Sequence, residues 1–485
     1  MEQQTKDSLT QLFENWAGEP VVKIEPLPPA GSDRRYYRMI GANKAAVGAF
    51  SPNDEENHTF LKFTNHFYKK GIAVPALYGE DVKNHTYLLQ DLGDISLFKY
   101  LATNRKDGAF PEALIPVYKQ VVEDLAELQI KGHEGLNYKK WCYQINKFDK
   151  AAMLWDLNYF KYYFLKVSNI PFDEALLQRD YNRLTRFLNK ADNDYFMFRD
   201  FQARNIMLVE GKPHYIDYQG GRKGARQYDL ASLLCQAKAN IPYEVRDQLL
   251  EYYMDAAGNL GKFDRKAFEK YYYPFVLIRC IQVLGAYGFR GIYERKTHFL
   301  TSIPFAIRNI EWVLGKIDIK ELKIPYLRET LERLVASRDW SLLLPQEQKD
   351  KKLTVTISSF SYRRGIPVDT SGHGGGFVFD CRALHNPGRF APYKRLTGRD
   401  IEVQDFLKAN SRIETYLEDV YDLVDASVEK YMKRSFSNLM VNFGCTGGQH
   451  RSVYCADSLT KHLKEKYDIH VVTNHVEQEL KNWKN

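Results

Sequence analysis

Two aspartates and one asparagine stand beside apolar, strand-like runs in the stretch FMFRDFQARNIMLVEGKPHYIDYQGG, residues 196–221. Four residues separate Asp200 from Asn205, and Asp217 lies twelve residues after Asn205, at the end of the run PHYID. Phosphoryl transfer needs three such groups: a carboxylate that orients the attacking hydroxyl and accepts its proton, and a carboxylate and an amide oxygen that hold Mg²⁺ against the nucleotide phosphates. The alternative is that both aspartates only cap turns.

The spacing D-x4-N…D is that of the catalytic loop and metal-binding aspartate of kinases. The span RDFQARNIML…YIDYQGGRKGARQYDLASLL resembles the aminoglycoside-phosphotransferase-like kinase superfamily. Within it, the span is most similar to the bacterial cell-wall-recycling kinases that phosphorylate N-acetylmuramate and N-acetylglucosamine, both amino sugars, at the anomeric hydroxyl. The resemblance implies ATP and Mg²⁺ as cofactors, Asp200 as the catalytic base, and Asn205 and Asp217 as magnesium ligands.

The resemblance covers roughly the first two thirds of the chain, including GSDRRYYR and LLQDLG. It implies that Gln90, Asp91 and Leu92 lie at the hinge between two lobes, where backbone groups read adenine. It also implies that Gly31 and Ser32 lie in the loop over the phosphates, since small residues let backbone N–H groups approach an anion.

One departure concerns the cation that kinases place on the third strand to bind phosphate. The run KAAVGAF offers only Lys44, at its start, so Glu56 lacks its expected partner. Either another cation, Arg34 or Arg35, serves the phosphates, or the metal alone does.

Charged residues also follow the predicted metal-binding aspartate. Arg222, Lys223 and Arg226 lie in a Gly-punctuated loop and either contact substrate or form a solvated basic loop. Asp229 opens the helix-like run QYDLASLL, so we expect it to cap or support the structure and not to catalyse.

A second set of residues lies in FGCTGGQHRSV, which is typical of a strand, a Gly-rich turn and a helix. Backbone N–H groups of Thr446, Gly447 and Gly448 would form a nest for an anion, with Arg451 adding a charge-assisted bond. Two functions compete. The spacing C-x5-R from Cys445 is that of cysteine-dependent phosphatases, and the alternative is pure phosphate binding. A bare C-x5-R motif is weak, so binding is favoured.

The runs GIPVD…FVFDCRALHNPGRFAPYKRLTGRD and GCTGGQHRS resemble the C-terminal domain of RapZ-type RNase adapter proteins. That family is associated with glucosamine-6-phosphate sensing and with binding a small RNA. The resemblance implies a sugar-phosphate pocket, with Asp380, Arg382 and His385 near it. Its residues would be Cys445, Thr446, Gly447, Gly448, Gln449, His450, Arg451 and Ser452.

RapZ-type proteins carry a P-loop ATPase domain before this module, but this sequence has no G-x4-G-K-[ST] motif. A sugar kinase is predicted in that place. Basic residues of this module could contact RNA, although a solvated basic loop is the commoner explanation. They are Arg363, Arg364, Arg389, Lys394, Arg395 and Arg399.

The elements that must position these residues divide the chain into two domains. Residues 1–337 predict a small β-rich lobe and a larger helical lobe, with a strand-loop-strand element between helical blocks. Residues 338–352 are polar and predict a linker. Residues 353–485 predict an α/β domain. The expected fold class is therefore an α+β two-lobed protein-kinase-like domain followed by a smaller α/β domain.

Composition agrees with this division. A chain of 485 residues with 44% hydrophobic residues can bury two cores. Its formal charge of +8 permits nucleotides, sugar phosphates or RNA but does not require them. Six scattered cysteines and a polar N-terminus favour a reducing, cytoplasmic compartment. The apolar run PFVLIRCIQVLGAYGF contains Arg279 and Gln282, so we expect a buried helix and no membrane span.

Two functions from different classes follow. The first is ATP- and Mg²⁺-dependent phosphorylation of an amino sugar, with a C-terminal module that senses a sugar phosphate. The second is a regulatory adapter that binds RNA or a metabolite, in which the kinase domain is only a nucleotide sensor.

Overall fold

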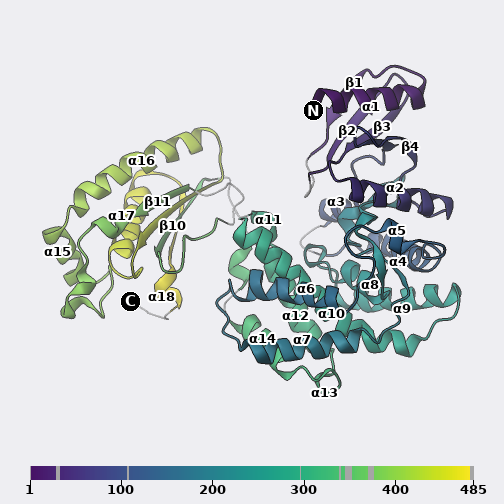
Figure 1. Cartoon of the computed structure of the whole chain (residues 1–485). Helices are drawn as coiled ribbons and strands as arrows, with labels where there is room; N and C mark the ends of the chain where they lie inside the picture. The colour runs from purple at the N-terminus through teal and green to yellow at the C-terminus, as the bar shows by residue number, and fades with distance from the viewer. Residues whose placement is uncertain are drawn as a thin grey trace. The chain divides into compact units, whose positions relative to one another are not determined.

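The computed structural model describes residues 2–28, 33–105, 109–294, 296–337, 340–344, 352–369 and 376–480. Two compact units divide the chain. The N-terminal unit comprises Met1–Phe289 and Ser302–Trp340, and the C-terminal unit comprises Arg290–Thr301 and Ser341–Asn485. Most of the linker predicted for residues 338–352 lies outside the described residues. The predicted fold class is confirmed: a kinase-like unit precedes an α/β unit (Figure 1).

The N-terminal unit begins with a five-stranded antiparallel sheet in the order β1-β2-β3-β5-β4. Leu9 and Phe13 of α1 (Glu2–Ala17) pack with Met39 and Leu88 in the core under this sheet. The helix α2 (Asp54–Lys69) connects β3 to β4. The strands are β1 (Lys23–Pro26), β2 (Arg35–Ile40), β3 (Ala45–Phe50), β4 (Leu77–Asp81) and β5 (Thr86–Gln90).

A helical lobe follows, and two short antiparallel strand pairs interrupt it. The connections between these strands carry the predicted kinase residues. The pairs are β6 (Tyr195–Met197) with β9 (Arg222–Gly224), and the hairpin β7 (Ile206–Val209) with β8 (Lys212–Tyr215). The main helices are α4 (Ile115–Ile130), α6 (Lys150–Phe160), α7 (Glu174–Leu188), α8 (Gln227–Leu234), α9 (Tyr243–Asn259), α10 (Arg265–Tyr287), α12 (Ile303–Leu314) and α14 (Pro325–Ala336).

The apolar run predicted to be a buried helix lies in α10. Residues 265–293 are long and apolar enough to cross a membrane, but 61% of the apolar window is buried inside the protein. Phe275, Leu277, Ile278 and Ile281 are fully buried. The helix is therefore the central core helix of the lobe, as predicted.

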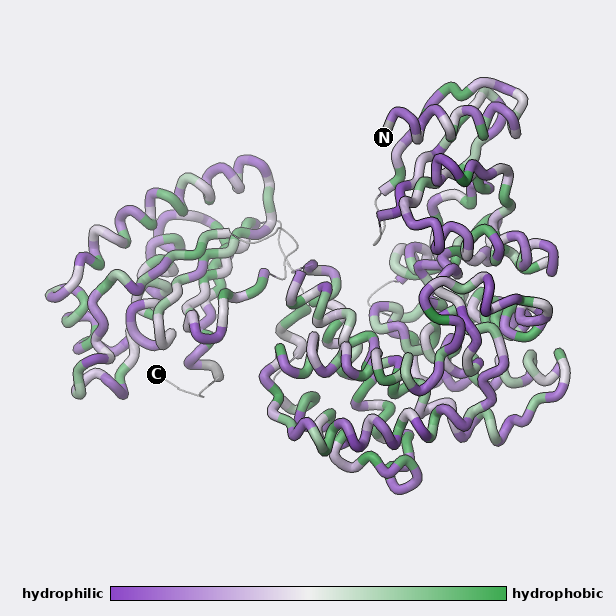
Figure 2. Tube along the Cα trace, viewed as in Figure 1, coloured by the Kyte–Doolittle hydropathy of each residue, from purple (hydrophilic) through white to green (hydrophobic). Residues whose placement is uncertain are grey.

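The C-terminal unit is built on a four-stranded parallel sheet in the order β11-β12-β10-β13. Hydrophobic residues run along its strands, and hydrophilic residues are frequent on the outer helices (Figure 2). In register, Ser361 pairs with Cys445 and Ser359 with His475, so the carboxyl ends of these strands meet at one edge. Its elements are β10 (Thr354–Ser361), β11 (Gly376–Asp380), α15 (Ile401–Asn410), α16 (Ile413–Lys433), β12 (Asn438–Cys445), α17 (Arg451–Lys466), β13 (His470–His475) and α18 (Val476–Leu480).

Candidate functional site

The loop between β6 and β7 carries the predicted catalytic aspartate in a strained, firmly held backbone. Arg199 has a positive φ of 83°, a left-handed conformation that is costly for a residue with a side chain. The buried carboxylate of Asp229 accepts the backbone N–H groups of Phe198 at 2.7 Å and Arg199 at 2.9 Å. Burial raises the pKa of Asp229 to about 6, although these bonds lower it. Asp229 thus supports the loop before Asp200, in agreement with its predicted supporting role.

Asp200 presents a half-exposed carboxylate that an arginine of α10 holds. Its side chain is 44% exposed, and its Oδ1 accepts a bond of 3.2 Å from Nη2 of Arg279. Loss of hydration would raise the pKa of Asp200, but the positive charges of Arg279, Arg199 and Arg204 outweigh it and lower the pKa. The carboxylate is therefore ionised at neutral pH, as a proton acceptor must be.

The hairpin β7–β8 brings the two predicted magnesium ligands together. Asn205 donates through Nδ2 to the backbone oxygen of Asp200 at 2.9 Å and to Oδ2 of Asp217 at 3.3 Å. Donation through the nitrogen leaves the amide oxygen of Asn205 as the atom that could bind a metal. A pair of this kind fits Mg²⁺, which takes one or two protein oxygens and completes its shell with phosphates and water.

A second amide links the predicted metal-binding carboxylate to the helix α2. Gln219 donates through Nε2 to Oδ1 of Asp217 at 2.9 Å and to Oε1 of Glu56 at 3.2 Å. Loss of hydration raises the pKa of Asp217, the amide of Gln219 lowers it, and the charge of Asp200 raises it further. Sequence reasoning missed Gln219, since a glutamine two residues after an aspartate is no signal by itself.

Glu56 on α2 has an arginine as its partner. Nη2 of Arg34 lies 2.7 Å from Oε1 of Glu56, and the Arg34 side chain is only 2% exposed. The guanidinium also lies 5.5 Å from the ring centroid of Phe60. Arg35, the other candidate, is exposed on β2. Arg34 thus forms the buried ion pair with α2 for which the third strand offers no lysine.

The predicted hinge residues follow β5. The backbone N–H of Gln90 donates to Ala76 at 2.9 Å, and Leu92 is buried. Asp91 accepts two bonds from Arg38, at 2.6 and 3.1 Å, so its carboxylate has a structural role. Gly31 and Ser32, predicted for the phosphate loop, lie outside the described residues.

The basic residues after Asp217 are mostly structural. Lys223 forms an ion pair with Asp194, and Arg226 is buried with its guanidinium 3.9 Å from the ring centroid of Tyr195. Arg222 folds back to donate to the backbone oxygen of Gly220 at 3.0 Å. These contacts hold Lys223 and Arg226 within the fold, and the buried Arg226 does not fit the solvated basic loop that was the alternative to substrate contact.

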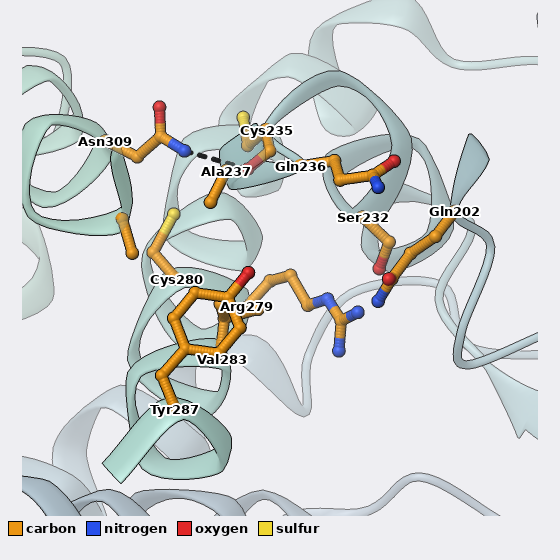
Figure 3. A pocket seen from close by; sticks show the side chains of 11 residues that line it. Gln202, Ser232, Cys235, Gln236, Ala237, Arg279, Cys280, Val283, Tyr287 and Asn309 are labelled. Carbon is orange, nitrogen blue, oxygen red and sulfur yellow. Dashed lines mark hydrogen bonds between the residues drawn. The ribbon is translucent and has the colours of Figure 1, made fainter. Parts of the chain in front are cut away.

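A small cavity lies against Arg279, beside the catalytic loop (Figure 3). Its volume of about 20 Å³ accommodates about one water molecule. Gln202, Ser232 and Tyr287 line it together with Arg279, whose buried Nε has no hydrogen-bond partner in the described part of the chain. This cavity is too small to receive a sugar ring.

In the C-terminal unit, the Gly-rich turn joins β12 to α17 at the carboxyl edge of the sheet. Gly448 has a φ of 65°, and its N–H donates to Sγ of Cys445 at 3.1 Å. Ser452 Oγ lies 3.2 Å from the same sulfur. Ser361 at the end of β10 donates to the backbone oxygen of Thr446 at 2.8 Å. The turn therefore folds around the Cys445 thiol.

Three predicted pocket side chains in this turn bind the protein's own backbone. Gln449 donates to Leu396 at 2.7 Å, and Nε2 of the buried His450 lies 2.9 Å from the oxygen of Tyr393. Nη1 of the buried Arg451 donates to the backbone oxygens of Arg382 at 3.1 Å and Leu384 at 2.9 Å. These side chains hold the neighbouring loops, a structural role in place of the ligand contact that the resemblance implied for them.

The other residues expected near this turn lie around it. The guanidinium of Arg382 binds the carboxylate of Asp380 at 2.6 Å and lies 4.1 Å from the ring centroid of Tyr362. His385 is exposed, with its ring 6.1 Å from that of Phe406. The charge of Arg451 contributes to a lowered pKa of Asp380, after the larger effect of Arg382.

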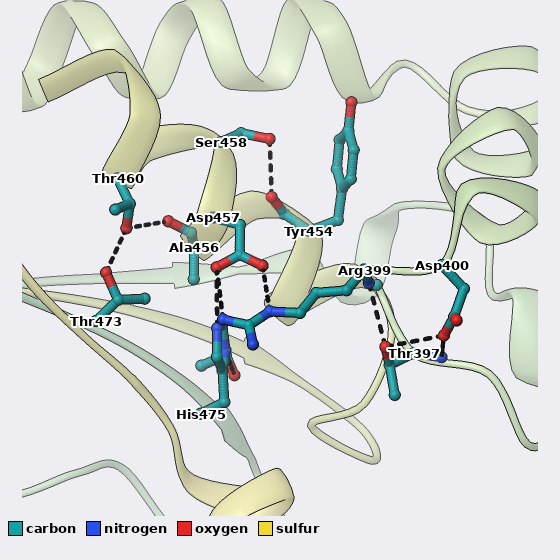
Figure 4. A network of polar contacts seen from close by, with 12 residues as sticks. Thr397, Arg399, Asp400, Tyr454, Ala456, Asp457, Ser458, Thr460, Thr473 and His475 are labelled. Carbon is teal, nitrogen blue, oxygen red and sulfur yellow. Dashed lines mark hydrogen bonds and ion pairs between the residues drawn. The ribbon is translucent and has the colours of Figure 1, made fainter. Parts of the chain in front are cut away.

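A polar network that the sequence did not indicate links β10, β13 and α17. His475 bridges Ser359 at 2.8 Å and Asp457 at 2.9 Å, and Asp457 also pairs with Arg399 at 2.8 Å (Figure 4). Ser359 is fully buried, so the network supports the sheet and is not a catalytic triad. Of the basic residues considered for RNA, Arg399 is held here and Arg364 pairs with Glu477.

Comparisons with known proteins agree with the two units. Residues 23–271 match the phosphotransferase enzyme family, and residues 353–479 match the RapZ C-terminal domain. A nucleotide-binding protein of Bacillus cytotoxicus is 35% identical over 195 residues, which are 38% of this chain and 61% of that protein. One from Dinoroseobacter shibae is 37% identical over 147 residues, 30% of this chain and 44% of that protein. The chain thus spans about half the length of the curated relatives it matches.

Solved structures with a related chain trace include two kinases. A choline kinase from Streptococcus pneumoniae aligns with a TM-score of 0.39 and 12% identity, over 66% of this chain and 98% of the other. The amicoumacin kinase hAmiN, in complex with AMP-PNP, Ca²⁺ and its ligand, aligns with a TM-score of 0.43 and 10% identity, over 72% and 98%. The family match covers residues 23–271, more than half of the 485 residues, and the chain therefore belongs to the phosphotransferase enzyme family, with a RapZ-type C-terminal domain after the kinase-like unit.

Proposed function

We propose that this protein is a cytoplasmic, ATP- and Mg²⁺-dependent kinase that phosphorylates an amino sugar. The proposed acceptor is the anomeric hydroxyl of N-acetylmuramate or N-acetylglucosamine in cell-wall recycling. The kinase domain is assigned to residues 1–337, and the C-terminal domain, residues 353–485, binds a sugar phosphate that regulates it. The observation that carries the proposal is the half-exposed Asp200 carboxylate, held by Arg279 next to the Asn205–Asp217 pair.

Asp200 accepts the proton of the attacking hydroxyl. Its lowered pKa keeps it ionised at neutral pH, and the bond from Arg279 fixes one oxygen, so the other oxygen is available to the acceptor. Asp229 holds the loop through two backbone bonds, which keeps the base in place during the reaction.

Asn205 and Asp217 would hold Mg²⁺, which neutralises charge on the transferring phosphoryl group when bound. Gln219 orients Asp217 and links it to Glu56. Arg34, paired with Glu56, takes the role of the missing lysine at the phosphates. Backbone groups of the segment Gln90–Leu92, together with Gly31 and Ser32, contact the nucleotide in this proposal.

At the C-terminal domain, the turn from Cys445 to Ser452 binds the sugar phosphate through backbone N–H groups. Three side chains in this turn already hold neighbouring loops, which supports a binding role for the backbone and a structural role for those side chains. Exposed basic residues of the same domain, such as Arg363 and Arg395, are the proposed RNA contacts.

The test is a screen of free sugars for ATP-dependent phosphorylation, with the position of the product phosphate read by phosphorus NMR. Asp200→Asn should lower turnover by about 10² to 10⁴ while leaving nucleotide binding largely intact, because Asp200 acts on the acceptor. Near-normal turnover in this variant would refute the assignment of the base. Nucleotide binding without turnover of any sugar by the native protein would favour the adapter function instead.

A further inference from the structure

The hydroxyl of Tyr228 is the point at which two arginines of the reaction centre meet. Tyr228 lies in the first turn of α8 and is fully buried. Its hydroxyl accepts a bond of 2.7 Å from Nη1 of Arg199 and a bond of 3.4 Å from Nη1 of Arg279. Both arginines adjoin Asp200, since Arg199 precedes it in the chain and Arg279 donates to its carboxylate.

The side chain of Arg199 is held at both ends of its guanidinium. Nη2 donates to Asp156 of α6 at 2.6 Å, and Nη1 donates to Tyr228. The guanidinium carbon also lies 4.8 Å from the ring centroid of Phe148 and 5.1 Å from that of Tyr228. The left-handed backbone of Arg199 persists only where surrounding contacts maintain it. Because Arg199 and Asp200 share a peptide unit, these contacts set the direction in which the Asp200 side chain leaves the loop.

Arg279 holds the carboxylate itself. Its Nη2 donates to Oδ1 of Asp200 at 3.2 Å, and its Nη1 donates to Tyr228 and to Oε1 of Gln282. Its side chain is only 3% exposed, and its Nε faces the cavity that accommodates about one water molecule. In the described part of the chain, the hydroxyl of Tyr228 and the amide of Gln282 are therefore the groups that orient this guanidinium toward Asp200.

The hydroxyl of Tyr228 is neutral. Burial raises the pKa of Tyr228, and this effect outweighs the charges of Arg199 and Arg279, which lower it. A neutral phenol accepts hydrogen bonds without adding a charge to the cluster. Tyr228 thus holds the positions of the two arginines and leaves their charges free to act on Asp200.

The first turn of α8 supports the catalytic loop through two successive residues. Asp229 accepts the backbone N–H groups of Phe198 and Arg199, whereas Tyr228 accepts from the side chains of Arg199 and Arg279. Side chains of successive helical residues leave the helix about 100° apart, so one turn reaches two different groups. The ring of Tyr228 is itself packed against Phe148, with 4.9 Å between the ring centroids.

We propose that Tyr228 is a positioning residue of the phosphoryl-transfer site. Its hydroxyl joins Arg199 to Arg279, and the joined arginines fix the Asp200 carboxylate in the orientation that the acceptor hydroxyl requires. This inference rests on the proposed kinase function and adds a residue that acts on the base through two others.

The test is Tyr228→Phe in the full chain, which removes the hydroxyl and keeps the ring. With N-acetylmuramate or N-acetylglucosamine as acceptor, kcat should fall about tenfold and the KM for ATP should stay unchanged, because only the orientation of the base is lost. The acid limb of the kcat/KM profile should stay at its native pH, because both arginines keep their charges. A native kcat, or a limb that moves as far as in Arg279→Met, would overturn the proposal.

Tyr215→Phe is the matched control for the loss of a buried hydroxyl. Tyr215 on β8 is 1% exposed, and its hydroxyl donates to the carboxylate of Asp124 on α4 at 2.6 Å. Both variants lose a hydrogen bond to a charged side chain, so both should unfold at a lower temperature. Only Tyr228→Phe should lose kcat. Equal losses of kcat would make the effect a consequence of destabilisation and would refute the positioning role.

A double-mutant cycle tests whether the hydroxyl acts through Arg279. Tyr228→Phe should lower kcat by a smaller factor in the Arg279→Met background than in the native protein, because one of the two joined arginines is already absent. The same factor in both backgrounds would contradict transmission through Arg279.

Hydrogen exchange of residues 196–207 gives a readout that does not depend on turnover. Exchange of this segment should be faster in Tyr228→Phe than in the native protein and in Tyr215→Phe, because the loop has lost a support. Unchanged exchange would refute the support by Tyr228, whatever the turnover. Faster exchange in a protein whose native form phosphorylates neither sugar would keep this support of the loop and refute the kinase instead.

Discussion

Replacing Arg279 by methionine removes the cation that holds the catalytic carboxylate while keeping an unbranched apolar side chain on α10. Arg279 donates to Asp200 at 3.2 Å, and its charge is the largest of those that lower the pKa of Asp200. Without it, loss of hydration is less opposed, so the pKa of Asp200 must rise. Since only the ionised base accepts a proton, the acid limb of the kcat/KM profile should move to higher pH.

The size of the shift follows from the geometry. A hydrogen bond to a charged group contributes about 1.5–3 kcal/mol in buried sites. The side chain of Asp200 is 44% exposed, so solvent screening reduces the effect to about 1–1.5 kcal/mol. One pKa unit corresponds to about 1.4 kcal/mol, and the acid limb should therefore shift by about one unit.

The measurement is kcat/KM for the phosphorylated sugar between about pH 3 and 8, because the lowered pKa of Asp200 places the native acid limb below the ordinary aspartate value of about 3.9. The matched control is Arg204→Met, because Arg204 is exposed and acts on Asp200 by charge alone, with a smaller effect than Arg279. A limb that stays in place in Arg279→Met, or moves to lower pH, would refute the reasoning. Equal shifts in both variants would mean that long-range charge, and not the bond, sets the pKa.

Other replacements test the remaining parts of the site. Asp217→Ala should raise the Mg²⁺ concentration needed for half-maximal rate and weaken Mg²⁺-nucleotide binding in calorimetry; unchanged metal dependence would make Asp217 structural. Arg34→Ala should raise the KM for ATP about tenfold, and Arg34→Lys should restore part of the loss. Arg35→Ala should have little effect on this KM; equal effects at both positions would contradict a role of the Arg34–Glu56 ion pair in ATP binding. Arg451→Ala should lower the free energy of unfolding of the C-terminal domain by about 1–3 kcal/mol, because two buried carbonyls lose their donor, whereas Cys445→Ser should change it less.

The grouping of the three candidate kinase residues could be predicted because they lie close together in the chain. Asp200, Asn205 and Asp217 fall within eighteen residues, and the hairpin that pairs Ile206 with Tyr215 joins them. Hairpin pairing follows from a local turn and alternating apolar residues, so spacing alone predicts the arrangement. The strand, turn and helix around Gly448 were predictable for the same local reason.

The side chains that act from a distance could not be predicted in this way. In the sequence, Arg279 is only a positive charge within an apolar, helical run. The packing of α10 against the loop that carries Asp200 brings its guanidinium to the carboxylate of Asp200, which lies 79 residues earlier in the chain. His475 meets Ser359 across 116 residues, through the parallel pairing of β10 and β13.

The sequence by itself determined which residues can carry the chemistry and which local elements present them. The tertiary structure decided which arginine pairs with Glu56, since Arg34 and Arg35 are equally basic neighbours in the chain. Arg34, immediately before β2, is buried against Glu56, while Arg35, the first residue of β2, is exposed, because side chains of successive extended residues point to opposite faces. Which face is buried depends on α2 packing against the sheet, and that contact exists only in the folded protein.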